Sequence, residues 1–171
     1  MSNPAPKTVK ESAIHDQSYP IFPHDLNMRG TIFGGCVMAQ VDKVAAVVAM
    51  RHSGLDCVTK LVDEQEFIDP AYLHENLILM ASVNRVWNTS MEIGVKVLAE
   101  NPKTRAKRHI VSAYLTFVAV DENQRPTSIP PVIPETDEER RRFAEAQWRR
   151  DERKRKAEEK KKMRENQKPR A

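Results

Sequence analysis

The pattern of hydrophobic and polar positions predicts one long buried helix in the first third of the chain. Over residues 36–50 only Gln40, Asp42 and Lys43 interrupt a run of apolar residues. The alanine and methionine content of this run and its length favour a helix over a strand, and a helix that is apolar on nearly all sides is buried. Gly54 is well placed to end it, because glycine readily adopts the left-handed conformation found at helix C-termini.

Four strand-like segments follow the expected helix. Residues 58–68 are β-branched with mixed polarity, residues 77–87 open with a continuous apolar run, residues 91–99 alternate, and residues 109–120 form a long strand. The short, turn-rich connections indicate an antiparallel meander. Residues 19–23 are expected to add a short edge strand, since their prolines exclude a central position. The predicted fold class is α+β, an antiparallel β-sheet wrapped around one long central helix.

The chain divides into three expected parts. Residues 1–18 are polar and contain prolines, so a flexible N-terminus is expected. Residues 19–134 form the folded domain and close with a proline-rich extended stretch. Residues 135–171 form a charged tail whose first turns are expected to dock through Phe143 and Trp148. The rest of the tail is expected to be partly helical, solvated and frayed.

Charge is distributed unevenly between the body and the tail. Residues 135–171 hold 15 of the 28 Lys and Arg residues and 10 of the 24 Asp and Glu residues, so the tail carries +5 and the remainder −1. The body therefore lacks the basic character of a nucleic-acid-binding domain. The tail holds many acids, and no aromatic residue is interleaved with its charges after Trp148, so we expect no specific nucleic-acid partner.

Cysteine usage and hydropathy indicate a cytoplasmic protein. Cys36 and Cys57 have neither the number nor the spacing of a disulfide framework or a metal site. The first residues contain no apolar signal region, and the longest apolar run is far shorter than the roughly 20 residues of a membrane helix. No membrane partner, metal or cofactor is expected.

Three of the five glycines gather just before the expected helix, at Gly30, Gly34 and Gly35. Glycines there leave the unpaired N–H groups of a helix N-terminus uncovered, which suits a carbonyl oxygen that becomes an oxyanion. A tight turn with close packing of helix on sheet explains the glycines equally well.

Two polar residues near these glycines are candidates for chemistry. Asp42 lies about two turns into the apolar helix. A carboxylate there is costly unless it is paired or lines a cavity, and it can serve as a base. An ordinary solvent-facing aspartate is the alternative. Asn27 can donate to a substrate carbonyl or orient a water, but turns often contain asparagine for local reasons.

Taken together, these residues resemble a known family. The segment Asn-Met-Arg-Gly-Thr-Ile-Phe-Gly-Gly-Cys-Val-Met-Ala-Gln-Val-Asp over residues 27–42 is similar to the signature of hotdog-fold acyl-CoA thioesterases. The subgroup is the cytosolic acyl-CoA hydrolase family, including its small bacterial members. The resemblance keeps its order and spacing over roughly residues 20–150. It departs at His74 and Glu75, where the family usually has Gly-Asp.

The resemblance implies an enzyme of fatty acid metabolism that hydrolyses fatty acyl-CoA to free fatty acid and CoA. Asp42 matches the catalytic carboxylate, acting as general base or as nucleophile, and Asn27 matches the catalytic asparagine. In this family one comes from each partner of a dimer with a continuous sheet, and bacterial members are often trimers of dimers. Backbone N–H groups of Gly34 or Gly35 would hold the thioester oxygen. CoA would be contacted by Lys60, Leu61, Val62, Thr89, Ser90 and Met91, with Lys60 able to meet a phosphate.

Two other functions stay open. Asp69 and His74 have the spacing seen in hotdog enoyl-CoA hydratases, although in those enzymes the pair precedes the central helix. A non-catalytic acyl-CoA-binding sensor is the second alternative, and the retention of both Asn27 and Asp42 argues against it. No G-x-S-x-G motif occurs in the chain, which argues against a serine hydrolase.

Overall fold

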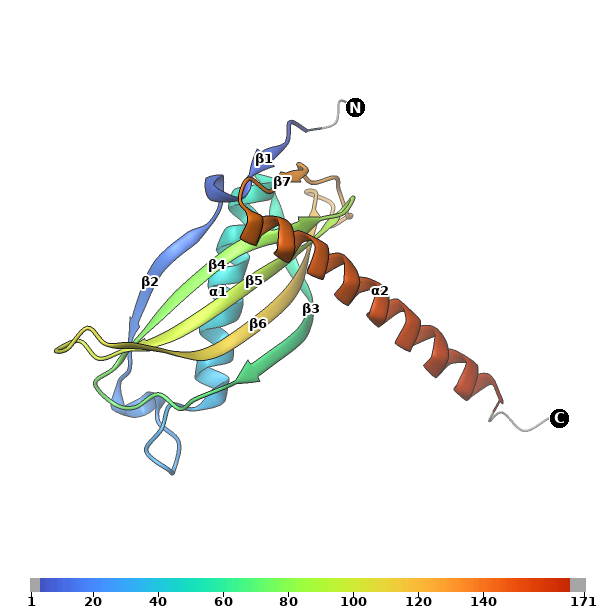
Figure 1. Ribbon diagram of the computed structural model, residues 1–171. Helices are drawn as coiled ribbons and strands as arrows, with labels where there is room; N and C mark the ends of the chain where they lie inside the picture. Colours follow the sequence, from blue (N-terminus) through green and yellow to red (C-terminus); the bar gives the residue numbers. More distant parts are fainter. Residues whose placement is uncertain (1–3, 167–171) are drawn as a thin grey trace.

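The computed structural model describes residues 4–166, and its centre is a sheet with one helix on each face. Helix α1 (Gly34–Ser53) packs on one face, and α2 (Asp137–Asn166) crosses the other (Figure 1). All five strands of the sheet are antiparallel to their neighbours. They are β2 (Ile14–Pro20), β3 (Asp56–Phe67), β4 (Asn76–Val86), β5 (Ser90–Glu100) and β6 (Lys107–Val120). This is the α+β architecture that the hydrophobic pattern predicted.

The apolar run after the glycines forms α1, as predicted. Val41, Val44 and Val48 are fully buried, because the helix lies against the inner face of the sheet. Gly54 adopts a φ of 72°, and its N–H donates to the carbonyl of Met50 at 2.8 Å. The left-handed glycine therefore ends the helix where the sequence indicated.

The order of strands in the sheet corrects the predicted meander. The order is β2-β4-β5-β6-β3, so β3 pairs with β6 and not with β4. Residues 68–75 connect β3 to β4, and in the sheet β5 and β6 lie between these two strands. The apolar start of β4 suits a strand with neighbours on both sides, which β2 and β5 provide. The mixed polarity of β3 suits an edge, and within residues 4–166 its outer edge has no partner strand.

The N-terminal segment is more ordered than the sequence suggested. The short strand β1 (Lys7–Thr8) pairs in parallel with β7 (Val132–Ile133), and a 3₁₀ turn η1 (Val9–Glu11) leads into β2. The edge strand therefore begins at Ile14, before the position expected. The predicted flexible segment thus holds regular structure from Lys7 onward, because its backbone pairs with distant residues. Residues 1–3 and 167–171 lie outside the described part.

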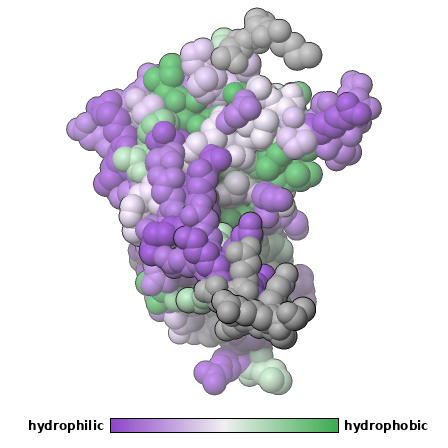
Figure 2. Space-filling view, turned by 90° about the vertical axis from the view of Figure 1, so that its right-hand side faces the viewer, coloured by the Kyte–Doolittle hydropathy of each residue, from purple (hydrophilic) through white to green (hydrophobic). Residues whose placement is uncertain are grey.

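Helix α2 is long and strongly charged. The side chains from Lys154 to Arg164 are exposed, and this end projects beyond the sheet (Figure 1). Figure 2 looks onto this side of the molecule, where hydrophilic residues are prominent. Within residues 4–166 no helix is both long enough and apolar enough to cross a membrane.

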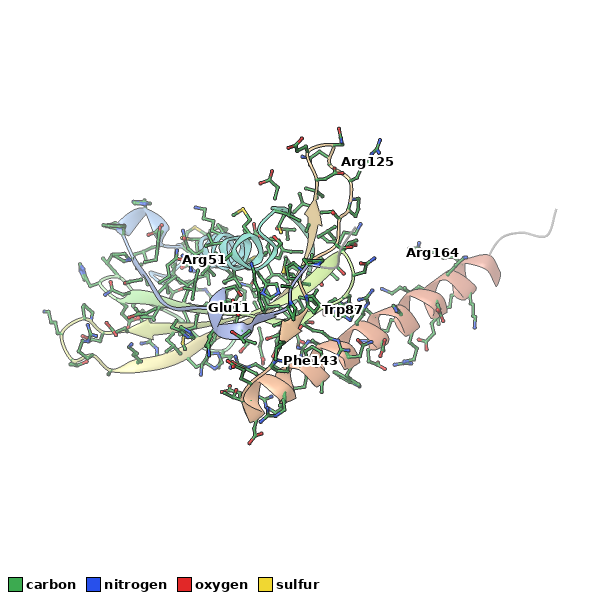
Figure 3. All side chains as sticks on the ribbon, turned by 90° about the horizontal axis from the view of Figure 1, so that it is seen from above. Glu11, Arg51, Trp87, Arg125, Phe143 and Arg164 are labelled. Carbon is green, nitrogen blue, oxygen red and sulfur yellow. The ribbon has the colours of Figure 1, made fainter. Side chains whose placement is uncertain are left out.

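The first half of α2 docks on the outer face of the sheet (Figure 3). The Arg85 guanidinium lies 4.0 Å from the centre of the Phe143 ring, and Trp87 Nε1 donates to Gln147 Oε1 at 2.9 Å. Docking through Phe143 is as predicted, but docking through Trp148 is wrong, since its side chain is 66% exposed. Arginine and amide side chains, which look like surface residues in the sequence, make most of these contacts.

Candidate active site

The loop before α1 holds Asn27 in a half-buried position. Its Oδ1 accepts hydrogen bonds from the N–H groups of Arg29 at 2.8 Å and Thr31 at 3.4 Å, while its Nδ2 donates to Thr31 Oγ1 at 2.8 Å. Gly30 adopts a φ of 75°, which lets the chain reverse here. Within one protomer the Asn27 amide therefore fixes the loop that carries it.

The start of α1 offers backbone donors. Phe33 is the N-cap residue and forms no side-chain cap, while the N–H groups of Cys36 and Val37 both donate to its carbonyl. Within residues 4–166 the N–H groups of Gly34 and Gly35 have no hydrogen-bond acceptor. Together with the helix dipole, these two donors form a site suited to an oxygen that gains negative charge.

Packing explains only one of the two glycines. A Cβ on Gly35 would lie 2.3 Å from the Phe33 ring, so that ring would have to move. A Cβ on Gly34 would meet only the Phe67 ring at 3.5 Å, which is ordinary van der Waals contact. Neither glycine has a positive φ. The space at Gly34 therefore favours the ligand-binding explanation over the tight-turn explanation.

Asp42 lies half-buried on α1 and is held by a residue that sequence reasoning missed. Thr59 of β3 donates its hydroxyl to Asp42 Oδ1 at 2.8 Å. One carboxylate oxygen is thereby oriented, while Oδ2 has no hydrogen bond within the described residues. The only signal for Thr59 in the sequence was its place directly before the predicted CoA-contact residue Lys60.

The two segments predicted to contact CoA lie at the same level of the sheet. Val118 of β6 is the register partner of both Val58 in β3 and Ser90 in β5. The segment 60–62 is exposed at the free edge of β3, and Thr89 and Ser90 are half-buried. Met91 is fully buried, backbone included, and is paired with both β4 and β6, so within one protomer it offers no surface to a ligand.

Within one protomer the predicted site residues form two separate groups. Asn27, Gly34 and Gly35 gather at the start of α1, whereas Asp42 lies against Thr59, next to the segment 60–62 that is predicted to contact CoA. The rise of an α-helix places Asp42 about 12 Å along the axis from Gly34. No hydrogen bond joins Asn27 to Asp42 in residues 4–166. This separation favours a site that a second protomer completes.

An apolar pocket of about 320 Å³ opens beside Gly34. Ile32 and Val37 line one side, and residues 67–71 with Ile110 line the other. A hydrocarbon chain can therefore lie next to the free N–H donors of the helix. A larger pocket of about 530 Å³, on the outer face near the start of α2, contains none of the predicted site residues.

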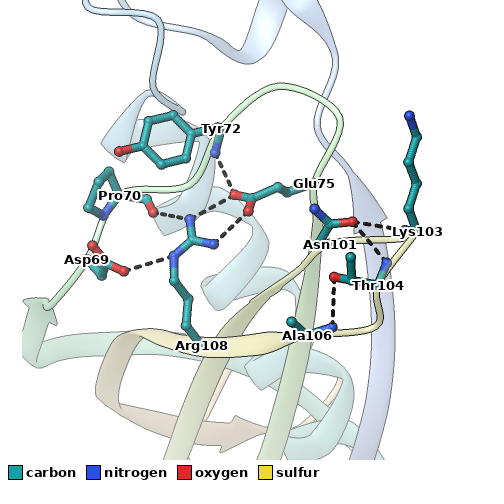
Figure 4. Close-up of polar contacts among 9 residues, drawn as sticks. All are labelled: Asp69, Pro70, Tyr72, Glu75, Asn101, Lys103, Thr104, Ala106 and Arg108. Atoms are coloured by element: carbon teal, nitrogen blue, oxygen red, sulfur yellow. Dashed lines mark hydrogen bonds and ion pairs between the residues drawn. The ribbon is translucent and has the colours of Figure 1, made fainter.

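Arg108 of β6 holds the loop between β3 and β4, which lines the pocket beside Gly34, through several hydrogen bonds (Figure 4). Its two terminal nitrogens donate to Glu75 at 2.6 and 2.8 Å, and its Nε donates to Asp69 at 2.8 Å. Hydrogen bonds from Arg108 hold the pKa of Glu75 below its ordinary value. His74 adopts a φ of 70° in this loop, a conformation that favours glycine and explains why the resemblance expects glycine there.

The same cluster removes the support for a hydratase. Asp69 is engaged by Arg108, while His74 is exposed, and no hydrogen bond joins Asp69 to His74 in the described part of the chain. Both residues follow α1 in the chain and lie in the loop between β3 and β4. They therefore do not form a catalytic pair.

Comparisons with known proteins show which family this chain is similar to. Residues 29–106 match the family described as Thioesterase superfamily. The chain is 37% identical over 139 residues to an uncharacterized acyl-CoA thioester hydrolase, YkhA of Bacillus subtilis, covering 81% of this chain and 80% of that protein. A solved hexameric acyl-CoA thioesterase superposes with a TM-score of 0.86 at 37% identity, over 90% of this chain and 97% of that one.

A second solved structure contains the ligand. The acyl-CoA hydrolase of Staphylococcus aureus, in complex with butyryl-CoA, CoA and CoA disulfide, superposes with a TM-score of 0.84 at 33% identity, over 94% of this chain and 97% of that one. Further structures of that enzyme carry alanine in place of an aspartate, a threonine or an asparagine. The fold is the hotdog, and this chain belongs to the acyl-CoA thioester hydrolases of the thioesterase superfamily.

Proposed function

We propose that this enzyme hydrolyses fatty acyl-CoA through Asp42 of one protomer and Asn27 of a second. The observation that carries this proposal is the Asp42 carboxylate, oriented by the Thr59 hydroxyl at 2.8 Å beside the exposed segment of β3. The substitutions of an aspartate, a threonine and an asparagine in the Staphylococcus aureus enzyme support the same three residue types.

The chemistry needs an activated oxygen and a stabilised oxyanion. The N–H groups of Gly34 and Gly35 donate to the thioester oxygen as the carbonyl carbon becomes tetrahedral. Asp42 either removes a proton from the attacking water or attacks the carbonyl carbon itself to form an anhydride that water then opens. In both routes the C–S bond breaks and CoA leaves as the thiolate. The thiolate takes a proton from Asp42 in the general-base route and from water in the anhydride route, and Asn27 orients the water or the carbonyl.

In this proposal CoA lies along the exposed segment 60–62 and the half-buried residues Thr89 and Ser90. Lys60, at the free edge of β3, meets a phosphate of the nucleotide end, and residues 61–62 and 89–90 contact the pantetheine arm through their backbone. The acyl chain enters the apolar pocket beside Gly34. The CoA complex of the Staphylococcus aureus hydrolase supports a substrate of this class.

The free edge of β3 supports a dimer. Val58, Leu61 and Val62 are exposed there, and an unpaired strand edge with apolar side chains is a template for another strand. A second copy that pairs with β3 outside residues 60–62 continues the sheet and leaves that segment to CoA. Three such dimers make a hexamer, and a similar solved thioesterase is hexameric. The relatives include cytosolic hydrolases, which supports a cytoplasmic location.

Thiol release from a panel of short to long acyl-CoAs tests the activity and its chain preference. Release of CoA with appearance of free fatty acid is the expected result. Binding of acyl-CoA without release, in folded oligomeric protein, would instead support the sensor alternative.

Mixed oligomers test the shared site. Asn27→Ala and Asp42→Ala proteins should each keep only a small residual rate, and co-refolded mixtures should regain activity, because some dimers then hold one intact site. A statistical mixture of dimers gives up to about a quarter of the parental sites in such an experiment. Mixtures that form heterodimers by mass spectrometry yet stay inactive would contradict the shared site.

Gly34→Ala tests whether the thioester oxygen occupies the space next to the N–H groups of Gly34 and Gly35. The variant should fold with equal or higher thermal stability, because alanine in a compatible conformation stabilises by about 0.4–1 kcal/mol. Hydrolysis should slow by about 10-fold or more, because the added methyl group crowds the oxyanion position. Calorimetry and steady-state kinetics measure the two effects, and unchanged kcat would show that the space is not used.

A further inference from the structure

A buried carboxylate near the start of α1 has no role in the proposed reaction. Asp25 is only 6% exposed, at the end of the 3₁₀ turn η2 (Pro23–Asp25). Burying a carboxylate is costly unless hydrogen bonds compensate for the lost water. Asp25 lies two residues before Asn27, and within residues 4–166 no hydrogen bond joins their side chains.

Three donors from three different elements converge on this carboxylate. Tyr19 of β2 donates its hydroxyl to Oδ1 at 2.9 Å, and the backbone N–H of Phe22 donates to Oδ2 at 2.9 Å. Cys36, in the first turn of α1, donates its thiol to Oδ1 at 3.3 Å. The Asp25 side chain therefore joins the end of the edge strand, the 3₁₀ turn and the start of the central helix.

The charge on Asp25 follows from these contacts. Burial opposes ionisation, but the hydrogen bonds from Phe22, Tyr19 and Cys36 outweigh it, so the pKa of Asp25 lies below its ordinary value. Burial and the negative charge of Asp25 raise the pKa of both Tyr19 and Cys36, which keeps these two groups protonated as donors. The three hydrogen bonds thus persist over the neutral pH range.

The backbone of Asp25 adds a fourth tie. Its carbonyl accepts the N–H of Phe33, the N-cap residue of α1, at 2.7 Å. The bridge between Leu26 and Ile32 lies just inside this contact. The Asn27 loop, residues 26–32, is therefore closed at its base by the hydrogen bond between Phe33 and Asp25. The orientation of this loop relative to α1 depends on the Asp25 side chain.

We propose that Asp25 is a positioning residue for hydrolysis, holding the Asn27 loop in a fixed place against the first turn of α1. This role rests on the proposed function of Asn27, since Asp25 acts through that residue and does not touch the substrate. A shift of about 1 Å in a positioned group can cost roughly 100-fold in rate. The hydrogen bonds of Asp25 prevent such a shift.

The first variant is Asp25→Asn, which keeps the shape of the side chain. Its NH₂ group replaces one carboxylate oxygen and cannot accept a hydrogen bond from the donors that surround Asp25. We expect kcat to fall about 10- to 100-fold while KM for acyl-CoA changes little. Glu92→Gln is the matched control, because Glu92 is a fully buried carboxylate on the other face of the sheet. It should lower the unfolding temperature and leave kcat unchanged. Equal loss of kcat in both variants would reduce Asp25 to a stabilising residue and overturn the proposal.

A double variant separates this proposal from the role of Asn27. Asp25→Asn combined with Asn27→Ala should be no slower than Asn27→Ala alone, because the positioned group is already absent. Multiplied losses would mean that Asp25 acts independently of Asn27 and would overturn the proposal. Full activity of Asn27→Ala would refute the proposed function of Asn27 itself, whereas an impaired Asn27→Ala beside a fully active Asp25→Asn would refute only the positioning role.

Cys36 provides a test that does not depend on the folding of Asp25→Asn. Cys36→Ser retains a donor to Asp25 and should keep kcat close to that of the parent enzyme. Cys36→Ala removes the donor and should lower kcat severalfold with an unchanged KM. Equal activity of the serine and alanine variants would show that this hydrogen bond does not position the loop and would count against the proposal.

Discussion

Asp42→Asn is expected to reduce thioester hydrolysis by a factor of about 10² to 10⁴, the usual contribution of a general base. An amide cannot accept a proton from water and is a poor nucleophile, so both proposed routes fail. The asparagine still offers Oδ1 to the Thr59 hydroxyl, so the packing of α1 against β3 is preserved. Steady-state thiol release measures the loss, and thermal unfolding checks that the fold is kept.

Asp56→Asn is the matched control for this change. Asp56 is an exposed aspartate at the start of β3, the strand that also carries Thr59. Its replacement alters the net charge by the same amount and should leave the rate unchanged. A folded Asp42→Asn enzyme that keeps the parental rate would exclude Asp42 from the chemistry.

Arg149→Ala is expected to lower the free energy of unfolding by about 3–5 kcal/mol, the usual cost of leaving a buried charge without its partner. Glu92 is fully buried in β5, and Arg149 Nη2 donates to its Oε1 at 2.6 Å. The Arg149 guanidinium also lies 3.7 Å from the centre of the Tyr114 ring. Without Arg149, the Asn84 amide at 3.0 Å is the one hydrogen-bond donor left to this carboxylate within residues 4–166.

Urea unfolding at a fixed protomer concentration measures this loss, because the stability of an oligomer depends on concentration. Arg155→Ala is the control, since the ion pairs that Arg155 forms within residues 4–166, with Glu152 and Glu159, lie at the surface of α2, and such pairs contribute little. The combination Arg149→Met with Glu92→Leu should recover most of the stability, because no buried charge then lacks a partner. Equal effects of Arg149→Ala and Arg155→Ala would show that α2 is not anchored by this pair.

The local elements were largely predictable because their signals are local. The apolar run predicted α1 and Gly54 its end, and the four long strands were placed within a few residues of their observed bounds. The order of strands was not predictable from short connections alone. Pairing of β3 with β6 joins segments far apart in the chain, and the meander holds only from β4 to β6.

The candidate site was predictable only where its residues form a motif. Asn27, Asp42 and the glycines lie within one short segment that the family resemblance identifies. Thr59 and Asp25 were missed because a threonine in a strand and an aspartate in a turn are common, and their meaning depends on what they contact. The separation of Asn27 from Asp42 within one protomer likewise needed the helix geometry.

By itself, the sequence determined the α+β class, the buried helix and the family, because period, composition and motif spacing are properties of the chain. Only the tertiary structure decided which faces are covered. Glu92 lies at a polar position of an alternating strand, which predicts a solvent-facing side chain, yet α2 buries it completely. The tail docks through arginines because their guanidinium groups find a carboxylate and aromatic rings on the sheet, a complementarity that exists only once the sheet has formed.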